Sequence, residues 1–105
     1  MDRKLKNQLV KYLGRVSQKY SLEGVYLFGS QAKGTSHENS DIDLLIVSSS
    51  FEKVRHINRG IDIRLMWDVL YPMDLICVTP REFKTARNIP GTLIHEVLQH
   101  GVKLA

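Results

Sequence analysis

A Gly-Ser pair followed by two closely spaced aspartates is the pattern in this chain with the clearest chemistry. Gly29-Ser30 is separated by ten residues from Asp41-Ile42-Asp43. Glycine can adopt unusual dihedral angles, and a serine after it can present its hydroxyl and backbone N–H to a phosphate group. Two neighbouring carboxylates repel each other unless a cation lies between them, and Mg²⁺ binds carboxylates together with substrate phosphates. The pattern therefore predicts a site for a nucleotide and a divalent metal ion.

Two predicted strands hold this pattern in place. Residues 25–28 form an apolar run that is typical of a buried strand, and the glycine after them ends it. Residues 41–47 are apolar and β-branched after their acidic start, so they predict a second strand. Side chains alternate between the two faces of a strand. Asp41 and Asp43 are therefore expected on one face, and Ile42 on the other, toward the core.

Helical periodicity predicts two of the remaining elements. Apolar residues recur at helical spacing over residues 2–20, where Asp2 can act as the N-cap. A second helix is expected from near residue 50 to a point before Pro72, although a glycine in its course weakens it. Its inward-facing residues are expected to be Val54, Ile57, Ile61, Leu65 and Met66.

A third strand and two further helices complete the expected fold. Residues 74–78 predict the strand, and the capping-box sequence at residues 79–82 predicts a helix directly after it. Residues 92–100 predict the last helix, which Gly101 ends. Hydrophobic strands that alternate with helices indicate an α/β (α+β) fold, in which helices cover a small mixed β-sheet.

The composition is that of a soluble globular protein with one domain, residues 1–105. The chain is 43% apolar and 25% charged, and its length allows one modest core. No run approaches the length of a membrane span and the N-terminus shows no secretory signal, so a cytoplasmic location is expected. Cys77 lies in an apolar strand pattern, which indicates a buried thiol. The formal net charge of +4 favours anionic partners such as nucleotides, nucleic acid or an acidic protein.

The pattern around the aspartates resembles that of a known enzyme superfamily. The sequence GSQAKGTSHENSDIDLLIV at residues 29–47, with the later strand at residues 73–78, resembles the nucleotidyltransferases that include DNA polymerase β. It is most similar to the minimal nucleotidyltransferases, whose signature is Gly-Ser, a spacer of this length and Asp-x-Asp. The resemblance covers most of the chain and implies a polymerase-β-like nucleotidyltransferase fold.

The resemblance implies a catalytic metal site with three carboxylates. Asp41 and Asp43 match the two aspartates of the signature, and the family's third carboxylate lies on the strand after the second helix. We choose Asp74 for that role, because Asp62 and Asp68 fall inside the predicted second helix. Three carboxylates would hold two Mg²⁺ ions between the attacking oxygen, the α-phosphate and the leaving pyrophosphate.

The same resemblance implies residues that bind the nucleotide. Gly29 and Ser30 are expected to meet the β- and γ-phosphates, and Ser40 is expected to steady the loop before the aspartates. Many relatives carry arginine at the positions of Gln31 and Lys33. Lys33 keeps a positive charge and is expected to bind the nucleotide, whereas Gln31 cannot clamp a triphosphate in the same way.

The activity implied is Mg²⁺-dependent transfer of a nucleoside monophosphate to an acceptor hydroxyl. We expect the donor to be ATP, which would transfer AMP, with another NTP as the alternative. Many minimal members of the family are antitoxins that adenylylate a tyrosine of a HEPN-domain toxin encoded beside them. A chain of 105 residues leaves little room for an acceptor pocket, so a separate protein acceptor is expected. Nucleic acid is not expected as the primary substrate.

Two other functions stay open from the sequence. The chain could be a binding module that neutralises a partner by occlusion, without using the acidic site. It could also transfer the nucleotide to a small molecule such as an aminoglycoside, which would require a further substrate-binding domain or the cleft of a homo-oligomer.

Some other polar and aromatic residues are interpreted as structural. Trp67 and Tyr71 are expected to pack in the core or anchor the surface rather than stack on a base. A stripe on the predicted first helix is interpreted as a solvated face, with an acidic partner or a polynucleotide backbone as the alternative. The stripe consists of Lys4, Gln8, Lys11, Arg15 and Lys19.

Overall fold

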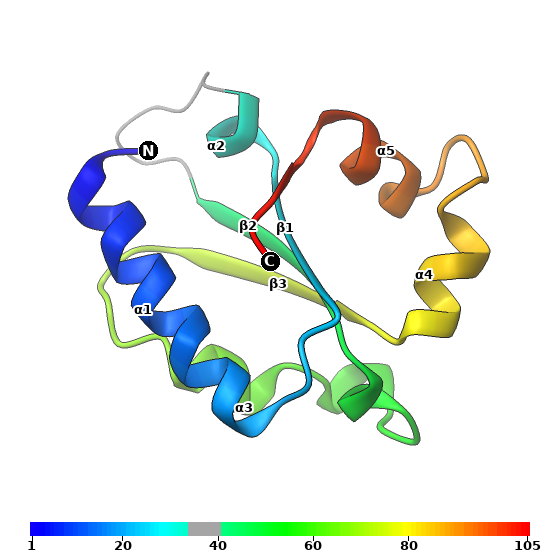
Figure 1. Ribbon diagram of the computed structural model, residues 1–105, viewed down its shortest axis with the longest axis horizontal. Coiled ribbons are helices and arrows are strands. Elements are labelled where there is room, and N and C mark those ends of the chain that lie inside the picture. The colour runs from blue at the N-terminus through cyan, green and yellow to red at the C-terminus, as the bar shows by residue number, and fades with distance from the viewer. Residues whose placement is uncertain (34–40) are drawn as a thin grey trace.

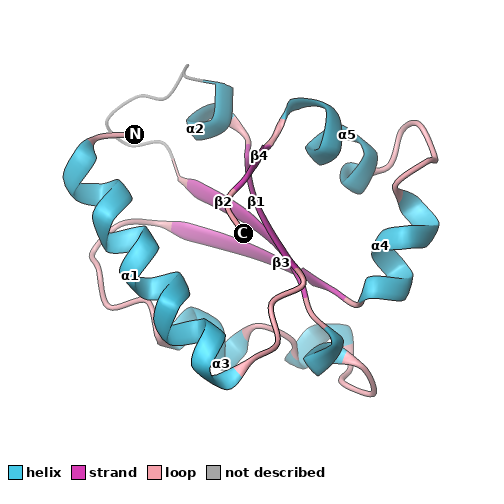
Figure 2. Cartoon of the chain, in the orientation of Figure 1, coloured by secondary structure: helices cyan, strands magenta, loops and turns pink. Residues whose placement is uncertain are grey.

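A four-stranded mixed sheet forms the centre of the molecule. The computed structural model describes residues 1–33 and 41–105 (Figure 1). The strands are β1 (Gly24–Phe28), β2 (Ile42–Val47), β3 (Met73–Val78) and β4 (Val102–Lys103), in the order β3-β2-β1-β4. β1 is antiparallel to both β2 and β4, and β2 is parallel to β3. The sheet is therefore mixed, as the sequence predicts (Figure 2).

Helices cover both faces of this sheet. α1 (Arg3–Lys19) and α3 (Ile61–Leu65) lie on one side, and α4 (Pro80–Ala86) and α5 (Leu93–His100) lie on the other (Figure 1). The apolar core is divided accordingly into two clusters. Within β2, Leu44 and Ile46 belong to the cluster under α1, whereas Leu45 and Val47 belong to the cluster under α4 and α5. This period of two confirms that β2 is buried on both faces.

Three of the helices begin at residues whose side chains cap the helix N-terminus. Asp2 caps α1 by accepting a hydrogen bond from the backbone N–H of Leu5 at 2.8 Å. Thr79 and Glu82 form the predicted capping box of α4, and Thr92 caps α5. None of the helices among the described residues combines the length and the apolar character needed to span a bilayer.

The predicted second helix was wrong. The region after β2 holds two 3-10 turns, at Ser49–Phe51 and His56–Asn58, followed by the short α3. Gly60 explains the break, because its φ is +79° and a Cβ there would lie 2.8 Å from the Cys77 sulfur, so the chain turns tightly against β3. Three residues that were expected to face inward are exposed instead: Ile57 at 77%, Ile61 at 54% and Leu65 at 77%.

The short strand β4 was not predicted. Its residues return beside β1, with Tyr26 opposite Lys103 and Leu27 opposite Val102. Two residues are too few to show an alternating pattern, so the sequence carries little signal for this strand. The return brings the end of α5 next to the end of β1, where the candidate site lies.

Candidate active site

The strand register places the candidate carboxylates in one row. Asp43 is paired with Phe28 of β1 on one side and with Asp74 of β3 on the other. Neighbouring strands lie about 4.8 Å apart, so Asp43 and Asp74 are adjacent and on the same face of the sheet. That face is the one covered by α4 and α5, because Leu45 and Ile76, each two residues further along, pack there.

The three aspartates also interact electrostatically. Asp41 stands directly before β2 and is exposed, as is Asp74, whereas Asp43 is half-buried. Burial of Asp43, followed by the negative charges of Asp74 and Asp41, raises the pKa of Asp43 above its usual value. The fold thus places Asp74 beside Asp43 in the sheet register, with Asp41 close enough to affect the pKa of Asp43.

The donor set suits a hard divalent cation. Carboxylate oxygens are the protein ligands of Mg²⁺, and a cation would relieve the repulsion that raises the pKa of Asp43. As placed, no three acidic, histidine or cysteine side chains among the described residues converge on one point. Asp41 and Asp74 are exposed, so rotation of their side chains toward Asp43 is sterically open.

Gly29 forms a tight turn directly against Asp43. Its φ is +75°, and a Cβ at this position would collide with Asp43 Oδ2. Both the backbone angle and the contact therefore exclude a side chain. The short helix α2 (Ser30–Lys33) begins immediately afterwards. The predicted phosphate turn and the central carboxylate are thus in contact.

Gln31 has a structural role that sequence reasoning missed. Only 6% of its surface is exposed, and its Nε2 donates a hydrogen bond to the Tyr71 hydroxyl at 2.9 Å. The Tyr71 carbonyl in turn accepts a hydrogen bond from Trp67 Nε1 at 2.8 Å, and Trp67 is buried. Gln31 therefore ties α2 to the segment before β3 instead of facing a phosphate. The side chain of Lys33 and the whole of Ser40 lie outside the described residues.

The end of α5 forms one wall beside the turn. A cavity of about 160 Å³ is lined by Phe28 and Gly29 and by Glu96 and His100 of α5. His100 Nε2 lies 3.7 Å from a Glu96 carboxylate oxygen. Sequence reasoning did not place this helix beside the turn, because the contact depends on the return of β4 along β1.

The other two acids considered for the third carboxylate lie elsewhere. Asp62 accepts a hydrogen bond from the Tyr20 hydroxyl at 2.7 Å and lies 3.9 Å from Lys19 Nζ. Asp68 lies 3.7 Å from Arg15 Nη2. Both acids therefore pair with residues in the C-terminal half of α1 or with Tyr20, which directly follows it. Two cations of the basic stripe are engaged in the same contacts.

A mixed sheet with helices on both faces, a Gly-Ser turn and a row of aspartates defines the nucleotidyltransferase class. The chain belongs to the nucleotidyltransferase domain family, whose model matches residues 9–103. This match confirms the family resemblance seen in the sequence. It also confirms the fold and the nucleotidyltransferase class that the resemblance implied.

Two relatives come from Methanocaldococcus jannaschii and are provisionally named protein adenylyltransferases. One is 35% identical over 89 residues, which is 78% of this chain and 60% of the relative. The other is 31% identical over 86 residues and 82% of each chain. The chain thus spans 60% of the first relative's length, which is less than two thirds.

Two solved structures share the fold. A crystal structure from Sulfolobus solfataricus, provisionally described as a nucleotidyltransferase, has a TM-score of 0.66 and 22% identity, covering 92% of this chain and 76% of that one. The second is the crystal structure of a toxin-antitoxin with AMP-PNP, with a TM-score of 0.62 and 26% identity. It covers 94% of this chain and 71% of that one.

Proposed function

We propose that this chain transfers AMP from ATP to a hydroxyl group of a partner protein in a Mg²⁺-dependent reaction. The observation that carries the proposal is the position of Asp43, between the Gly29 turn and Asp74. A nucleotide whose phosphates lie on the turn would have its reacting phosphorus next to the carboxylates. The turn proposed to bind the phosphates and the two carboxylates proposed to bind the metal ion are therefore adjacent.

In this proposal, the aspartates bind the metal ions and the residues of the turn bind the phosphates. Asp41, Asp43 and Asp74 would hold one or two Mg²⁺ ions, which supply positive charge to the phosphates when bound. Gly29 and Ser30 would bind the phosphates of ATP. Lys33 and Ser40, whose side chains lie outside the described residues, are proposed to assist them.

The transfer itself is a single displacement at phosphorus. The acceptor oxygen forms a bond to the α-phosphorus, and the bond from that phosphorus to the bridging oxygen breaks, so pyrophosphate leaves. Asp74 is at the exposed end of the carboxylate row and is proposed to take the proton of the acceptor hydroxyl. AMP then remains on the acceptor as a phosphodiester.

The comparisons support a protein as the acceptor. Both relatives are provisionally named protein adenylyltransferases, and one structural neighbour is a toxin-antitoxin with AMP-PNP. We propose accordingly that the chain is the antitoxin partner of a HEPN-type toxin, and that the toxin is the acceptor.

The test uses the chain, ATP, Mg²⁺ and the protein encoded by the adjacent gene. We expect a mass increase of one or more AMP units on the neighbour with the wild type and none with Asp43→Asn. Asp68→Asn is the matched control, because Asp68 is an exposed aspartate outside the sheet that pairs with Arg15 of α1. Equal labelling by the wild type and Asp43→Asn would reject the proposed site.

A further inference from the structure

The outer edge of β3 is covered by arginine side chains. β3 is an edge strand, and Pro72 and Val78 bond to β2 through their carbonyl groups. In a parallel ladder alternate residues face the partner strand, so the carbonyls of Met73 and Cys77 point outward. Arg64 Nε donates to the Met73 carbonyl at 3.1 Å, and Arg59 Nη1 donates to the Cys77 carbonyl at 3.5 Å. The two arginines therefore occupy two of the outward carbonyls to which a further strand would bond.

A shallow hollow of about 400 Å³ lies over this edge. Its lining includes Ile61 and Leu65 of α3, Leu75 of β3, and Arg64. Ile61 and Leu65 are one helical turn apart and share a face, whereas Ile63 points the other way and is fully buried. The packing of Ile63 therefore fixes α3 so that two large apolar side chains face the solvent.

This hollow borders the candidate active site at the edge strand β3. Asp74 contributes to its lining and is also the neighbour of Asp43 in the carboxylate row. Leu75 and α3 lie on one face of the sheet and the Asp74 side chain lies on the other with Asp43, so an acceptor bound in the hollow reaches that carboxylate around the edge of β3. The cavity beside Gly29 includes no carboxylate of the row.

The charges in the hollow are not equivalent. Arg59 is mostly buried and is neutralised by Glu82, whose carboxylate lies 2.6 Å from it. Arg64 is exposed and forms no ion pair with a described residue. The hollow thus presents two exposed apolar side chains, Ile61 and Leu65. It also presents one cation, Arg64, that is available to form an ion pair with a carboxylate. A polypeptide with apolar and acidic side chains complements this set, whereas the phosphates of a polynucleotide would meet apolar groups.

We propose that the hollow formed by Ile61, Arg64, Leu65 and Leu75 is the docking surface for the acceptor protein. The acceptor segment carries an apolar side chain that packs on Ile61 and Leu65, an acidic side chain that pairs with Arg64, and the hydroxyl residue that reaches Asp74. This inference rests on the proposed function, because it takes the acceptor to be a protein.

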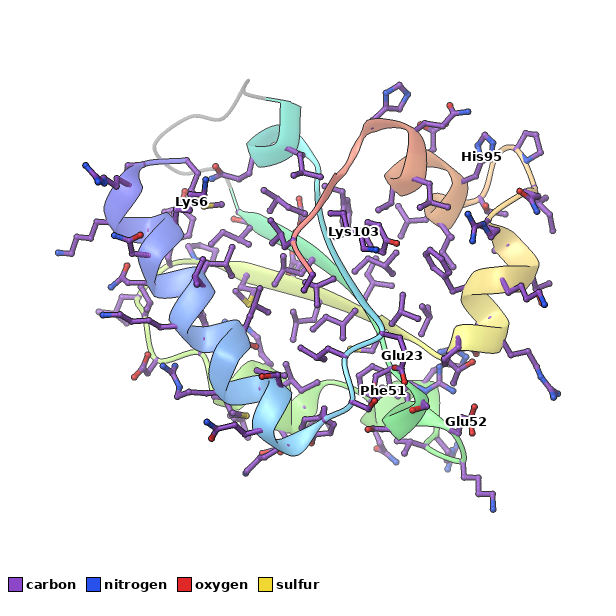
Figure 3. The ribbon with its side chains drawn as sticks, in the orientation of Figure 1. Lys6, Glu23, Phe51, Glu52, His95 and Lys103 are labelled. Atoms are coloured by element: carbon purple, nitrogen blue, oxygen red, sulfur yellow. The ribbon has the colours of Figure 1, made fainter. Side chains whose placement is uncertain are left out.

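The experiment compares two substitutions that add the same charge to two apolar surfaces. Leu65→Glu changes the hollow. Val10→Glu changes a larger groove of about 810 Å³ between α1 and β4, whose lining includes Lys6 and Lys103 (Figure 3). Leu65 is 77% exposed and Val10 is 62% exposed, so both variants are expected to fold like the wild type. The probes are the product of the adjacent gene, α-³²P-labelled ATP and a fluorescent ATP analogue.

We expect Leu65→Glu to lower labelling of the neighbour protein by about tenfold or more, the effect of losing one central interface side chain. Binding of the fluorescent ATP analogue in the presence of Mg²⁺ should stay at the wild-type level, and Val10→Glu should label normally. Wild-type labelling by Leu65→Glu would overturn the docking surface and leave the proposed function standing. Loss of labelling in Val10→Glu alone would place the acceptor in the other groove.

A binding measurement separates the two proposals when nothing is labelled. The Asp43→Asn variant is mixed with the neighbour protein, with and without Leu65→Glu, and complex formation is measured by gel filtration. A complex that depends on Leu65, without any labelling by the wild type, would support the surface and reject the proposed transfer. Labelling of RNA instead of protein, unaffected by Leu65→Glu, would overturn both.

Discussion

Gly29 lies against Asp43 so closely that a Cβ at residue 29 would collide with the Asp43 carboxylate. The turn proposed to bind the phosphates therefore packs directly against the residue proposed to bind the metal ion. A substitution in the turn must displace the carboxylate, and this coupling makes the arrangement testable.

Gly29→Ala is expected to abolish ATP binding and AMP transfer. The variant must accommodate a φ of +75° and the collision with Asp43, whereas Gly91→Ala must accommodate only a φ of +91°, since nothing lies within 4 Å of its Cβ. Both substitutions should lower the free energy of unfolding by about 1–2 kcal/mol through backbone strain. Activity assays and chemical unfolding of both variants are the measurements. Normal activity in Gly29→Ala would show that the contact is not needed.

The carboxylate row should make Mg²⁺ a stabilising ligand. In the presence of EDTA, Asp43→Asn should unfold at the same temperature as the wild type or a higher one, because it removes repulsion from Asp74 and Asp41. Addition of millimolar Mg²⁺ should raise the unfolding temperature of the wild type and of Asp68→Asn, but not that of Asp43→Asn. An equal response of all three proteins would mean that Mg²⁺ binds elsewhere.

The hydrogen bond between Gln31 and Tyr71 is expected to stabilise the position of α2. Tyr71→Phe removes this bond and should lower the free energy of unfolding by about 1 kcal/mol. Tyr26→Phe is the matched control, because the Tyr26 ring stacks on Phe83 and its hydroxyl has no hydrogen bond to a described residue. Equal stability changes in the two variants would argue against the proposed contribution of the bond.

Glu82 should contribute to stability in a pH-dependent way. Burial opposes its ionisation, but the Thr79 N–H and the Arg59 guanidinium outweigh burial and hold the pKa of Glu82 below its usual 4.5. A lowered pKa in the folded state means that this stabilisation is complete above pH 4.5 and is lost as the pH falls below it.

Glu82→Gln should accordingly reduce the loss of unfolding free energy between neutral pH and pH values below 4.5. Urea unfolding at a series of pH values measures this change. Glu52→Gln is the matched control, because Glu52 is also a glutamate and is exposed (Figure 3). Identical pH profiles for Glu82→Gln and the wild type would contradict the assignment.

The sequence predicted the elements whose signals are local. The N-cap at Asp2 and the capping box at Thr79 each depend on side chains within one helical turn, and both are present. Asp41 and Asp43 also follow from the period of two along one strand, since Ile42 between them is fully buried.

The features that the sequence did not predict depend on contacts between distant segments. The helix expected after residue 50 is broken where Gly60 packs against Cys77, and Ile61 and Leu65 are left exposed. Gln31 was compared with a phosphate-binding arginine, but its partner Tyr71 lies 40 residues away. Neither contact leaves a periodic pattern, so local reasoning could not find it.

The central claim is the transfer of a nucleotidyl group to a protein hydroxyl, and the position of the label in ATP tests it most directly. The chain, Mg²⁺ and the neighbour protein are incubated with ATP labelled either at the α-phosphate or at the γ-phosphate. Our account predicts that the α label becomes protein-bound, that the γ label does not, and that Asp43→Asn transfers neither. Transfer of the γ label, or transfer of the α label that persists in Asp43→Asn, would contradict it.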